Sequence, residues 1–344
     1  MRFYNIKIKG VDRLSLPVGL ISLSNVLHNL YVPHKLLARV SWMIIRVGAK
    51  FGAIKFFASE KDTPSVRLEN FNWQGWISEI TDVLKQNRLI PAFYFPPQLE
   101  RKKYSVLLLN NEGESIAFAK IAQDPVSYAE TLRERNALLY FNDKKFATFE
   151  VPKLLQHGNY KGSLYNLLSP IPRNTRTPPS TWGDLYQQAW LELVTTSYRN
   201  IKIENLSWWP KVKFLFDEWV EAIELLEKDE PLNGYRFYFA HGDFAPWNVS
   251  IVNKNLFLYD WENFSEEAPI FADPLYFILS TQILLKNDTF IMSIIRKIRM
   301  IRNLRFIDIA FSDVTLALLY FRISLANTTL ISVLDKVIRE IIRS

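Results

Sequence analysis

Residues 239–262 read FAHGDFAPWNVSIVNKNLFLYDWE, a stretch that combines apolar runs with several polar side chains. The apolar residues would suit buried strands. A buried carboxylate, however, costs free energy unless it is hydrogen-bonded, paired or bound to a metal ion. The polar residues are His241, Asp243, Asn248, Asp260 and Glu262. The stretch therefore predicts either a loop that faces water or a functional site.

The spacing of these polar residues favours a site. The segment VSIVNKNLFLYD (249–260) is typical of a hairpin, which would hold Asn248 and Asp260 at its two ends. Either residue alone could cap a turn or end a strand. Two oxygen ligands at adjacent strand ends would suit Mg²⁺, which prefers carboxylates and water. We therefore expect the two residues to converge on one ion.

The bulk composition limits the class of protein. The chain has 344 residues, 49% of them hydrophobic, which predicts a globular protein of two or three structural units. It has no cysteine, which excludes disulfides and thiolate metal sites and fits a reducing compartment. Neither a signal-peptide pattern nor an apolar run of about 18 residues is present. We therefore expect a cytoplasmic protein.

The positive charge is concentrated at the N-terminus. The net charge is +7, and residues 1–59 contain nine basic residues but only one acidic residue, Asp12. The rest of the chain is nearly neutral. A nucleic-acid-binding protein would also carry a recognition motif, and we find none. We therefore expect no nucleic-acid partner.

Residues 34–54 form a basic amphipathic pattern. Helical spacing places Lys35, Arg39, Arg46 and Lys50 in one narrow wedge, with apolar residues on the opposite side. Such a helix can lie on an anionic membrane surface. The commoner explanation is a helix docked on its own protein with one solvated face. Both alternatives stay open here, so peripheral membrane contact through residues 34–54 is a hypothesis.

The order of elements indicates three regions. Residues 1–90 form a basic, mainly helical extension. Residues 91–172 contain strands at 92–95, 103–109 and 115–121, a helix at 126–141 and two further short strands. A proline-rich connection at 169–179 then leads into residues 173–344, which are mostly helical.

The motif HGDFAPWN…LYDWE resembles the aminoglycoside phosphotransferase/choline kinase family, which is related to the protein kinases. The resemblance covers roughly residues 91–344, with its motifs concentrated in 239–274. It implies an α+β fold like that of protein kinases, with a small antiparallel sheet lobe carrying one helix and a larger, mainly helical lobe. The glycine-rich loop of protein kinases has no counterpart at 96–103, which reads PPQLERKK.

The resemblance also implies roles for particular residues. Asp243 would be the catalytic base, while Asn248 and Asp260 would hold Mg²⁺. Lys120 would contact the nucleotide phosphates and pair with a helix glutamate, Glu134 or its rival Glu130. The backbone near Ser169 and Ile171 would contact the nucleotide base. Supporting roles would fall to His241, which shapes the loop, and to Glu262.

The implied function is ATP-dependent transfer of a phosphoryl group to the hydroxyl of a small molecule, with GTP as an alternative donor. Aminoglycosides, amino alcohols and sugar or glycan-related compounds are all acceptor classes to consider. The alternative function is a kinase-like pseudoenzyme that serves as a nucleotide-binding or assembly module. The sequence does not define the oligomeric state.

Overall fold

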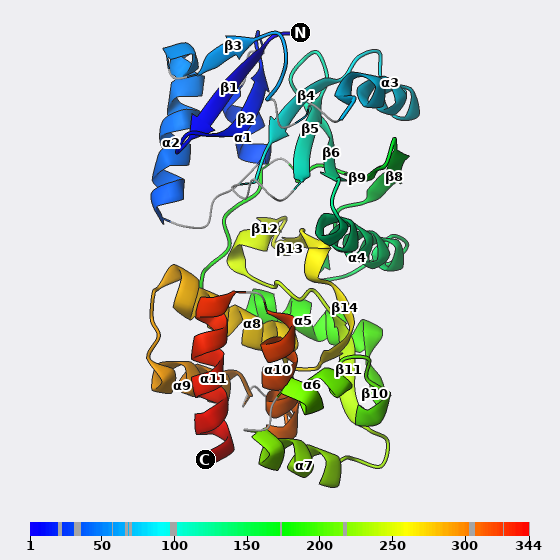
Figure 1. Ribbon diagram of the computed structural model, residues 1–344, viewed down its shortest axis with the longest axis vertical. Coiled ribbons are helices and arrows are strands. Elements are labelled where there is room, and N and C mark those ends of the chain that lie inside the picture. Colours follow the sequence, from blue (N-terminus) through cyan, green and yellow to red (C-terminus); the bar gives the residue numbers. More distant parts are fainter. Residues whose placement is uncertain are drawn as a thin grey trace. The chain divides into compact units, whose positions relative to one another are not determined.

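The computed structural model contains two compact units, shown together in Figure 1. The first comprises residues 1–144 and 151–174, and the second comprises residues 145–150 and 175–344. The structure describes all residues except 20–22, 31–35, 57, 66–67, 69–70, 97–101, 173, 216–218, 303–306, 326 and 344. Lys35 and residues 97–101, which are most of the segment compared with the glycine-rich loop, therefore lie outside the described residues, and the side chain of Arg39 is not described either.

The first unit is built on one eight-stranded antiparallel sheet in the order β3-β1-β2-β4-β5-β6-β9-β8. The strands are β1 (Phe3–Ile8), β2 (Val11–Pro17), β3 (Ser59–Lys61), β4 (Ile90–Tyr94), β5 (Lys103–Leu109), β6 (Ser115–Ala122), β8 (Leu154–Tyr160) and β9 (Ser163–Leu168). The predicted strands of 91–172 are present within a few residues of their expected ends.

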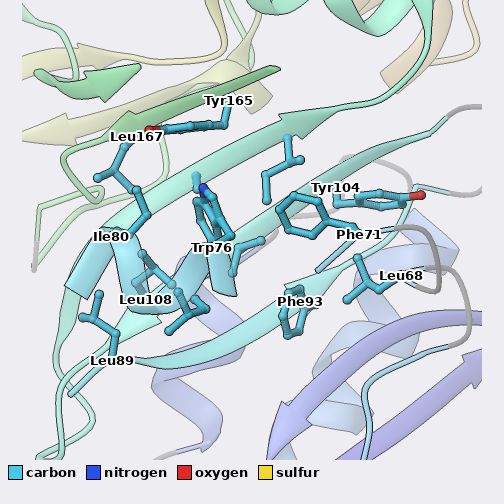
Figure 2. Close-up of a cluster of buried hydrophobic side chains, with 14 of the residues drawn as sticks. Leu68, Phe71, Trp76, Ile80, Leu89, Phe93, Tyr104, Leu108, Tyr165 and Leu167 are labelled. Carbon is cyan, nitrogen blue, oxygen red and sulfur yellow. The ribbon is translucent and has the colours of Figure 1, made fainter. Parts of the chain in front are cut away.

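Helix α3 (Trp73–Val83) covers one face of this sheet. It begins at Asn72, whose side chain accepts a hydrogen bond from the Gly75 N–H at 3.1 Å. Figure 2 shows Trp76 and Ile80 of this helix among large apolar side chains of the strands, including Phe93. Burying each such side chain stabilises the fold by roughly 1.5–3 kcal/mol.

The opposite face of the sheet packs against α1 (Leu23–Leu30) and α2 (Leu36–Lys50), with α4 (Pro125–Phe141) against β6, β8 and β9. Because successive strand residues alternate between faces, Ala119 and Ile121 of β6 face the α3 core, whereas Phe118 packs with the core of α1 and α2. Lys120 therefore belongs to the face that α4 covers.

The N-terminal residues do not form a separate extension. Strands β1, β2 and β3 extend the same sheet, and β2 pairs directly with β4, which begins at Ile90. A boundary after residue 90 would cut into that strand. Within residues 1–90, the helices α1, α2, α3 and the 3₁₀ helix η1 (Ala53–Phe56) contain more residues than the strands do, but the three strands β1, β2 and β3 were not predicted.

The second unit is mainly helical and carries two small sheets, β10-β11-β14 and β12-β13-β7. Its strands are β7 (Phe149–Glu150), β10 (Arg199–Ile201), β11 (Tyr235–Ala240), β12 (Val249–Val252), β13 (Asn255–Leu258) and β14 (Ser265–Pro269). Its helices are α5 (Asp184–Ser197), α6 (Trp209–Leu215), α7 (Val220–Lys228), α8 (Ala272–Ser280), α9 (Ile291–Arg302), α10 (Phe311–Ser324) and α11 (Thr328–Arg343). Short 3₁₀ turns lie at Ile203–Asn205, Pro246–Asn248 and Trp261–Asn263, and a π turn, η7, at Thr281–Leu285.

Helix α8 lies at the centre of the second unit. Every one of its residues is buried, and it packs against α9 and α10. An aromatic cluster lies beside it, in which the ring of Phe277 is 4.6 Å from that of Tyr186 and 5.3 Å from that of Trp182. A helix buried on all sides holds its polar residues in fixed positions, and α8 carries two that matter for the site.

The expected α+β fold, with an antiparallel sheet unit and a mainly helical unit, is confirmed. Helix α5 begins after Gly183 without a side-chain cap. Asp273 lies within the first turn of α8 and does not cap it. No helix among the described residues has the length and apolar character needed to cross a bilayer.

Candidate active site

Lys120 and Glu134 form a buried ion pair in the first unit. The Lys120 Nζ atom lies 2.7 Å from Glu134 Oε1, and the two side chains are 8% and 1% exposed. The rival glutamate, Glu130, instead bonds to Lys103 at 3.2 Å. Both ion pairs link α4 to the sheet, since Lys103 belongs to β5 and Lys120 to β6.

A buried ion pair is weak evidence for stability, because desolvation of both charges offsets much of their attraction. The Oε2 atom of Glu134 is also buried without a hydrogen-bond partner. An explanation for such a pair is that Glu134 positions Lys120 to bind an anionic ligand. The contact of Lys120 with nucleotide phosphates stays a prediction.

Ser169 and Ile171, whose backbone was expected to contact a nucleotide base, differ in whether their N–H groups are already hydrogen-bonded. The Ser169 N–H donates to the Lys153 carbonyl at 2.8 Å, and its hydroxyl accepts from the Lys153 N–H at 2.9 Å. Ser169 is therefore part of the link between β8 and β9, and its N–H is already used. Ile171 is half-buried, and its N–H has no partner within the described part of the chain.

In the second unit, the loop after β11 is fixed by the buried carboxylate of Asp273. Its oxygens accept hydrogen bonds from the backbone N–H groups of His241 and Gly242 at 3.0 and 2.9 Å. Burial nevertheless raises the pKa of Asp273 to about 6. Gly242 has a φ of +79°, and a Cβ there would lie 2.0 Å from the Asn263 carbonyl oxygen, so no other residue fits.

His241 shapes the same loop and does not face a reactant. Its ring is fully buried, and its centroid lies 4.5 Å from that of Trp261. Nδ1 accepts from the Asp243 N–H at 3.3 Å, which leaves Nε2 as the protonated nitrogen that donates to the Tyr259 carbonyl at 3.0 Å. The loop-shaping role expected for His241 matches this geometry.

The hairpin of β12 and β13 brings Asn248 and Asp260 to the same end. Val249 pairs with Leu258, and the Tyr259 N–H donates to the Asn248 carbonyl at 3.1 Å. The two-residue turn at the far end, Asn253–Lys254, has positive φ at both positions, as the tight hairpins of right-twisted strands require. The register of the hairpin therefore places Asn248 beside Tyr259, the neighbour of Asp260 in sequence.

Asp260 adopts a strained backbone conformation. Its φ of 70° and ψ of 57° are left-handed, a conformation that non-glycine residues rarely adopt. Its side chain does not cap the 3₁₀ turn that follows. Strain of this kind costs on the order of 1–3 kcal/mol and is concentrated at functional sites. The backbone conformation is therefore independent evidence that Asp260 belongs to a functional site.

Asp243 has a strongly perturbed carboxylate beside this hairpin. Burial, reinforced by the charge of nearby Asp260, raises the pKa of Asp243 to about 7. The Tyr276 hydroxyl of α8 hydrogen-bonds to the Asp243 side chain and opposes the rise. One oxygen, Oδ1, is buried without a hydrogen-bond partner. A carboxylate in this state can take up a proton near neutral pH.

The donor set at the hairpin fits a hard cation such as Mg²⁺. Asn248 donates its Nδ2 to the Asp243 carbonyl at 3.0 Å, which leaves the amide oxygen as its ligating atom. Asp260 supplies a carboxylate from the strained position. Within the described residues, no group of three or more histidine, cysteine, aspartate or glutamate side chains could hold a metal ion. Mg²⁺ commonly uses one or two protein carboxylates and completes its shell with water and phosphate oxygens.

Trp261 and Glu267, which follow the hairpin in sequence, make structural contacts. Trp261 is fully buried, and its Nε1–H donates to the Leu258 carbonyl at 3.1 Å, so it supports the hairpin and cannot line a pocket. Glu267 accepts hydrogen bonds from the N–H and hydroxyl of Ser207 at 3.0 and 2.6 Å. Glu262 is half-buried, and its charge contributes to the raised pKa of Asp243.

The sequence did not reveal the parts played by Tyr276 and Asp273. Tyr276 lies in the apolar run ADPLYFILS, where a tyrosine is indistinguishable from an ordinary core residue. The Asp-Pro dipeptide at 273–274 is typical of the start of a helix. In a helix buried on all sides, however, an aspartate of the first turn needs hydrogen-bond partners from elsewhere in the fold, and this need was a signal of its role.

No protein-family model matches this sequence, and no curated protein sequence does so either. Solved structures with a similar arrangement include an aminoglycoside phosphotransferase in a ternary complex with ADP and hygromycin B (12% identity, TM-score 0.45). A second is an aminoglycoside 2′-phosphotransferase bound to GDP (13%, 0.41), and a third is a candidate fructosamine-3-kinase from Haemophilus somnus 129PT (15%, 0.47). Each alignment covers 78% of this chain and 97% or 98% of the other chain.

At these identities and TM-scores, the likeness carries no information about what this chain acts on. We therefore argue its function from its own residues.

Proposed function

We propose that this protein is a nucleotide-dependent phosphotransferase that phosphorylates the hydroxyl of a small molecule. The observation that carries the proposal is the hairpin that brings Asn248 and a strained Asp260 together beside Asp243. Phosphoryl transfer requires positioning and charge neutralisation more than covalent catalysis. A carboxylate that can accept a proton, next to two oxygen ligands, supplies what that reaction needs.

Asp243 is the proposed base. It would orient the acceptor hydroxyl and accept its proton as the phosphoryl group is transferred, a contribution of about 10²–10⁴ in rate. Its unpartnered Oδ1 is the atom suited to that contact. The hydrogen bond from Tyr276 and the backbone contact to His241 fix the position of the carboxylate.

Asn248 and Asp260 are the proposed ligands of Mg²⁺. The ion would neutralise charge on the phosphates of the bound nucleotide. Lys120, aligned by Glu134, is the proposed contact of the nucleotide phosphates in the first unit. The carbonyl and N–H groups around Ile171 are the proposed contacts of the base, whereas the Ser169 N–H is excluded by its bond to Lys153.

The first experiment is a thermal unfolding assay with ATP or GTP, with and without Mg²⁺. A ligand present at about 100 times its dissociation constant stabilises a protein by roughly 2.7 kcal/mol, which a melting curve resolves. We expect a Mg²⁺-dependent rise in melting temperature for the wild type and its loss in Asp260→Ala. A rise with either nucleotide would then justify a screen of hydroxylated acceptors for phosphate transfer.

Absence of any shift with both nucleotides would contradict the proposal. The pseudoenzyme alternative would be favoured by a different result. In that case nucleotide raises the melting temperature, no acceptor is phosphorylated, and the Asp243→Asn variant behaves like the wild type. Asp243→Asn should abolish transfer and leave nucleotide binding largely intact, because an amide keeps the shape of the carboxylate but accepts no proton.

A further inference from the structure

Helix α2 and the 3₁₀ helix η1 present an exposed apolar surface in the first unit. We call it the α2 apolar face, and it consists of Met43, Ile44, Val47, Phe51 and Phe56. Phe51 is 76% exposed and Phe56 is 80% exposed. Single exposed apolar residues are common, but here five large ones lie within fourteen residues, and grouped exposed apolar side chains mark interaction sites.

Other residues of α2 and η1 are buried in the core of the first unit. The same helices already contribute Trp42, Ile45 and Ile54 to the core between α1, α2 and the sheet, and all three are buried. The described part of α2 is thus docked on its own protein, and membrane contact through residues 34–54 stays a prediction. The exposed side chains of the helix include Met43, Ile44 and Val47 as well as Lys50.

Two lysines lie beside the aromatic rings of the α2 apolar face. Lys50 and Lys55 are exposed, and their Nζ atoms lie over the rings of Phe51 and Phe56, at 5.9 and 5.4 Å from the ring centroids. Neither α2 nor η1 contains an acidic residue. The sole acid within residues 1–59 is Asp12, and its carboxylate accepts a hydrogen bond from the Ser65 hydroxyl.

We propose that the α2 apolar face binds the surface of a lipid bilayer that contains anionic phospholipids. The aromatic and aliphatic side chains would enter the boundary between headgroups and acyl chains, while Lys50 and Lys55 would meet lipid phosphates. This combination of apolar insertion and electrostatic attraction is how amphipathic helices bind membrane interfaces. The proposed contact is a peripheral one, through a helix that lies on the surface.

The charge pattern favours lipid over a second copy of this chain. A symmetric dimer through this face would bring together two copies of a surface whose own helices, α2 and η1, supply lysines but no acid to pair with them. An anionic lipid surface complements both Lys50 and Lys55, and each lysine near such a surface contributes about 1 kcal/mol. The proposal is independent of the phosphotransferase function and does not require it.

The test is co-sedimentation of the full-length protein with vesicles of equal parts phosphatidylglycerol and phosphatidylcholine, compared with phosphatidylcholine alone. We expect binding to the anionic vesicles and its loss in a Phe51→Ser/Phe56→Ser variant. A Lys50→Glu/Lys55→Glu variant should bind at least about thirtyfold more weakly, from the contribution of two lysines. High salt should weaken binding of the wild type as well.

The matched control is Phe214→Ser/Leu232→Ser, which removes two equally exposed apolar side chains from the second unit. It should bind like the wild type. The proposal is overturned if the wild type does not sediment with anionic vesicles, or if the variants of the α2 apolar face bind as well as the control. Concentration-dependent self-association that disappears in Phe51→Ser/Phe56→Ser, without vesicle binding, would instead assign this face to a dimer.

Discussion

Asp243 shows how a single residue acquires its chemistry from its neighbours. Burial and the charge of Asp260 raise its pKa, and the hydroxyl of Tyr276 opposes that rise with a hydrogen bond. Tyr276 is itself almost fully buried, and its own pKa is raised well above 10, so it stays a hydrogen-bond donor. The tyrosine therefore holds one carboxylate oxygen and leaves the other, Oδ1, available.

Removal of this hydroxyl by Tyr276→Phe should slow phosphate transfer and leave nucleotide binding unchanged. A hydrogen bond to a charged group contributes about 1.5–3 kcal/mol, so we expect kcat to fall by roughly tenfold or more. Steady-state kinetics should show the KM for nucleotide within a factor of two of the wild type. The fold should persist, because phenylalanine keeps the buried ring.

The control for this variant is Tyr235→Phe, which removes another buried hydroxyl in the second unit, one that donates to the Leu226 carbonyl at 2.8 Å. It should lose some stability but keep its kcat. Equal kinetic effects of the two substitutions would show that Tyr276 acts through general stability and not through Asp243.

At this scale the sequence was informative where residues are close along the chain. The order of His241, Asp243, Asn248 and Asp260 identified one loop and one hairpin, and the structure brings them together. Tyr276 and Asp273 could not be assigned in the same way. Their partners lie more than thirty residues away in sequence, and only the packing of α8 brings them into contact.

Among the elements, α4 is the one on which the nucleotide contact depends. Two ion pairs, Lys103–Glu130 and Lys120–Glu134, tie it to neighbouring strands of the sheet. Both glutamates lie on the same helix one turn apart, and both pairs are nearly buried. This similarity makes them a matched pair for separating a functional contact from a structural one.

We expect Glu134→Gln to lose the Mg²⁺-dependent nucleotide shift in the thermal assay, because Lys120 would lose the carboxylate that aligns it. Glu130→Gln should keep that shift, since its partner Lys103 has no role in our proposal. Breaking either buried pair should destabilise the protein, by up to about 3–5 kcal/mol. The comparison is therefore made on the nucleotide-induced shift and not on the melting temperature itself. A full shift in Glu134→Gln would contradict the role given to Lys120.

The elements that the sequence failed to predict are short or shaped by distant contacts. Strands β1 and β2 were missed because the basic charge and the following helical pattern dominated the N-terminal segment. A signal was present, since the Lys9–Gly10 turn, with positive φ at both residues, lies between two short apolar-rich runs. The hairpin predicted over 249–260, by contrast, has strongly apolar strands on both sides of its turn, and the local sequence pattern was enough to predict it.

The stability of the whole molecule depends on carboxylates that the fold has removed from water. Asp273 is one of these carboxylates, and because it is not a proposed metal ligand, its titration can be measured separately from metal binding. Its carboxylate faces the backbone N–H groups of His241 and Gly242 and the side chain of Tyr238, whose pKa is raised well above 10 so that it stays neutral. No opposite charge among these contacts compensates the ionised form.

This arrangement predicts that the carboxyl of Asp273 favours the folded protein most at low pH. Its pKa is about 6 in the folded state and near the model-peptide value of 3.8 in the unfolded chain. Between these values the folded state binds more protons than the unfolded state, so the free energy of unfolding falls as pH rises. From pH 5 to pH 7 the fall attributable to this group is about 1 kcal/mol.

Denaturant unfolding of the wild type and Asp273→Asn at pH 5, 6 and 7 measures this contribution. The variant should be less stable throughout, because an amide cannot accept both backbone hydrogen bonds. Its deficit should shrink by about 1 kcal/mol between pH 5 and pH 7, because only the wild type loses the contribution of this carboxyl group. A deficit that grows with pH would mean that the hydrogen bonds to the ionised carboxylate outweigh burial. The pKa of Asp273 in the folded protein would then lie below that in the unfolded chain.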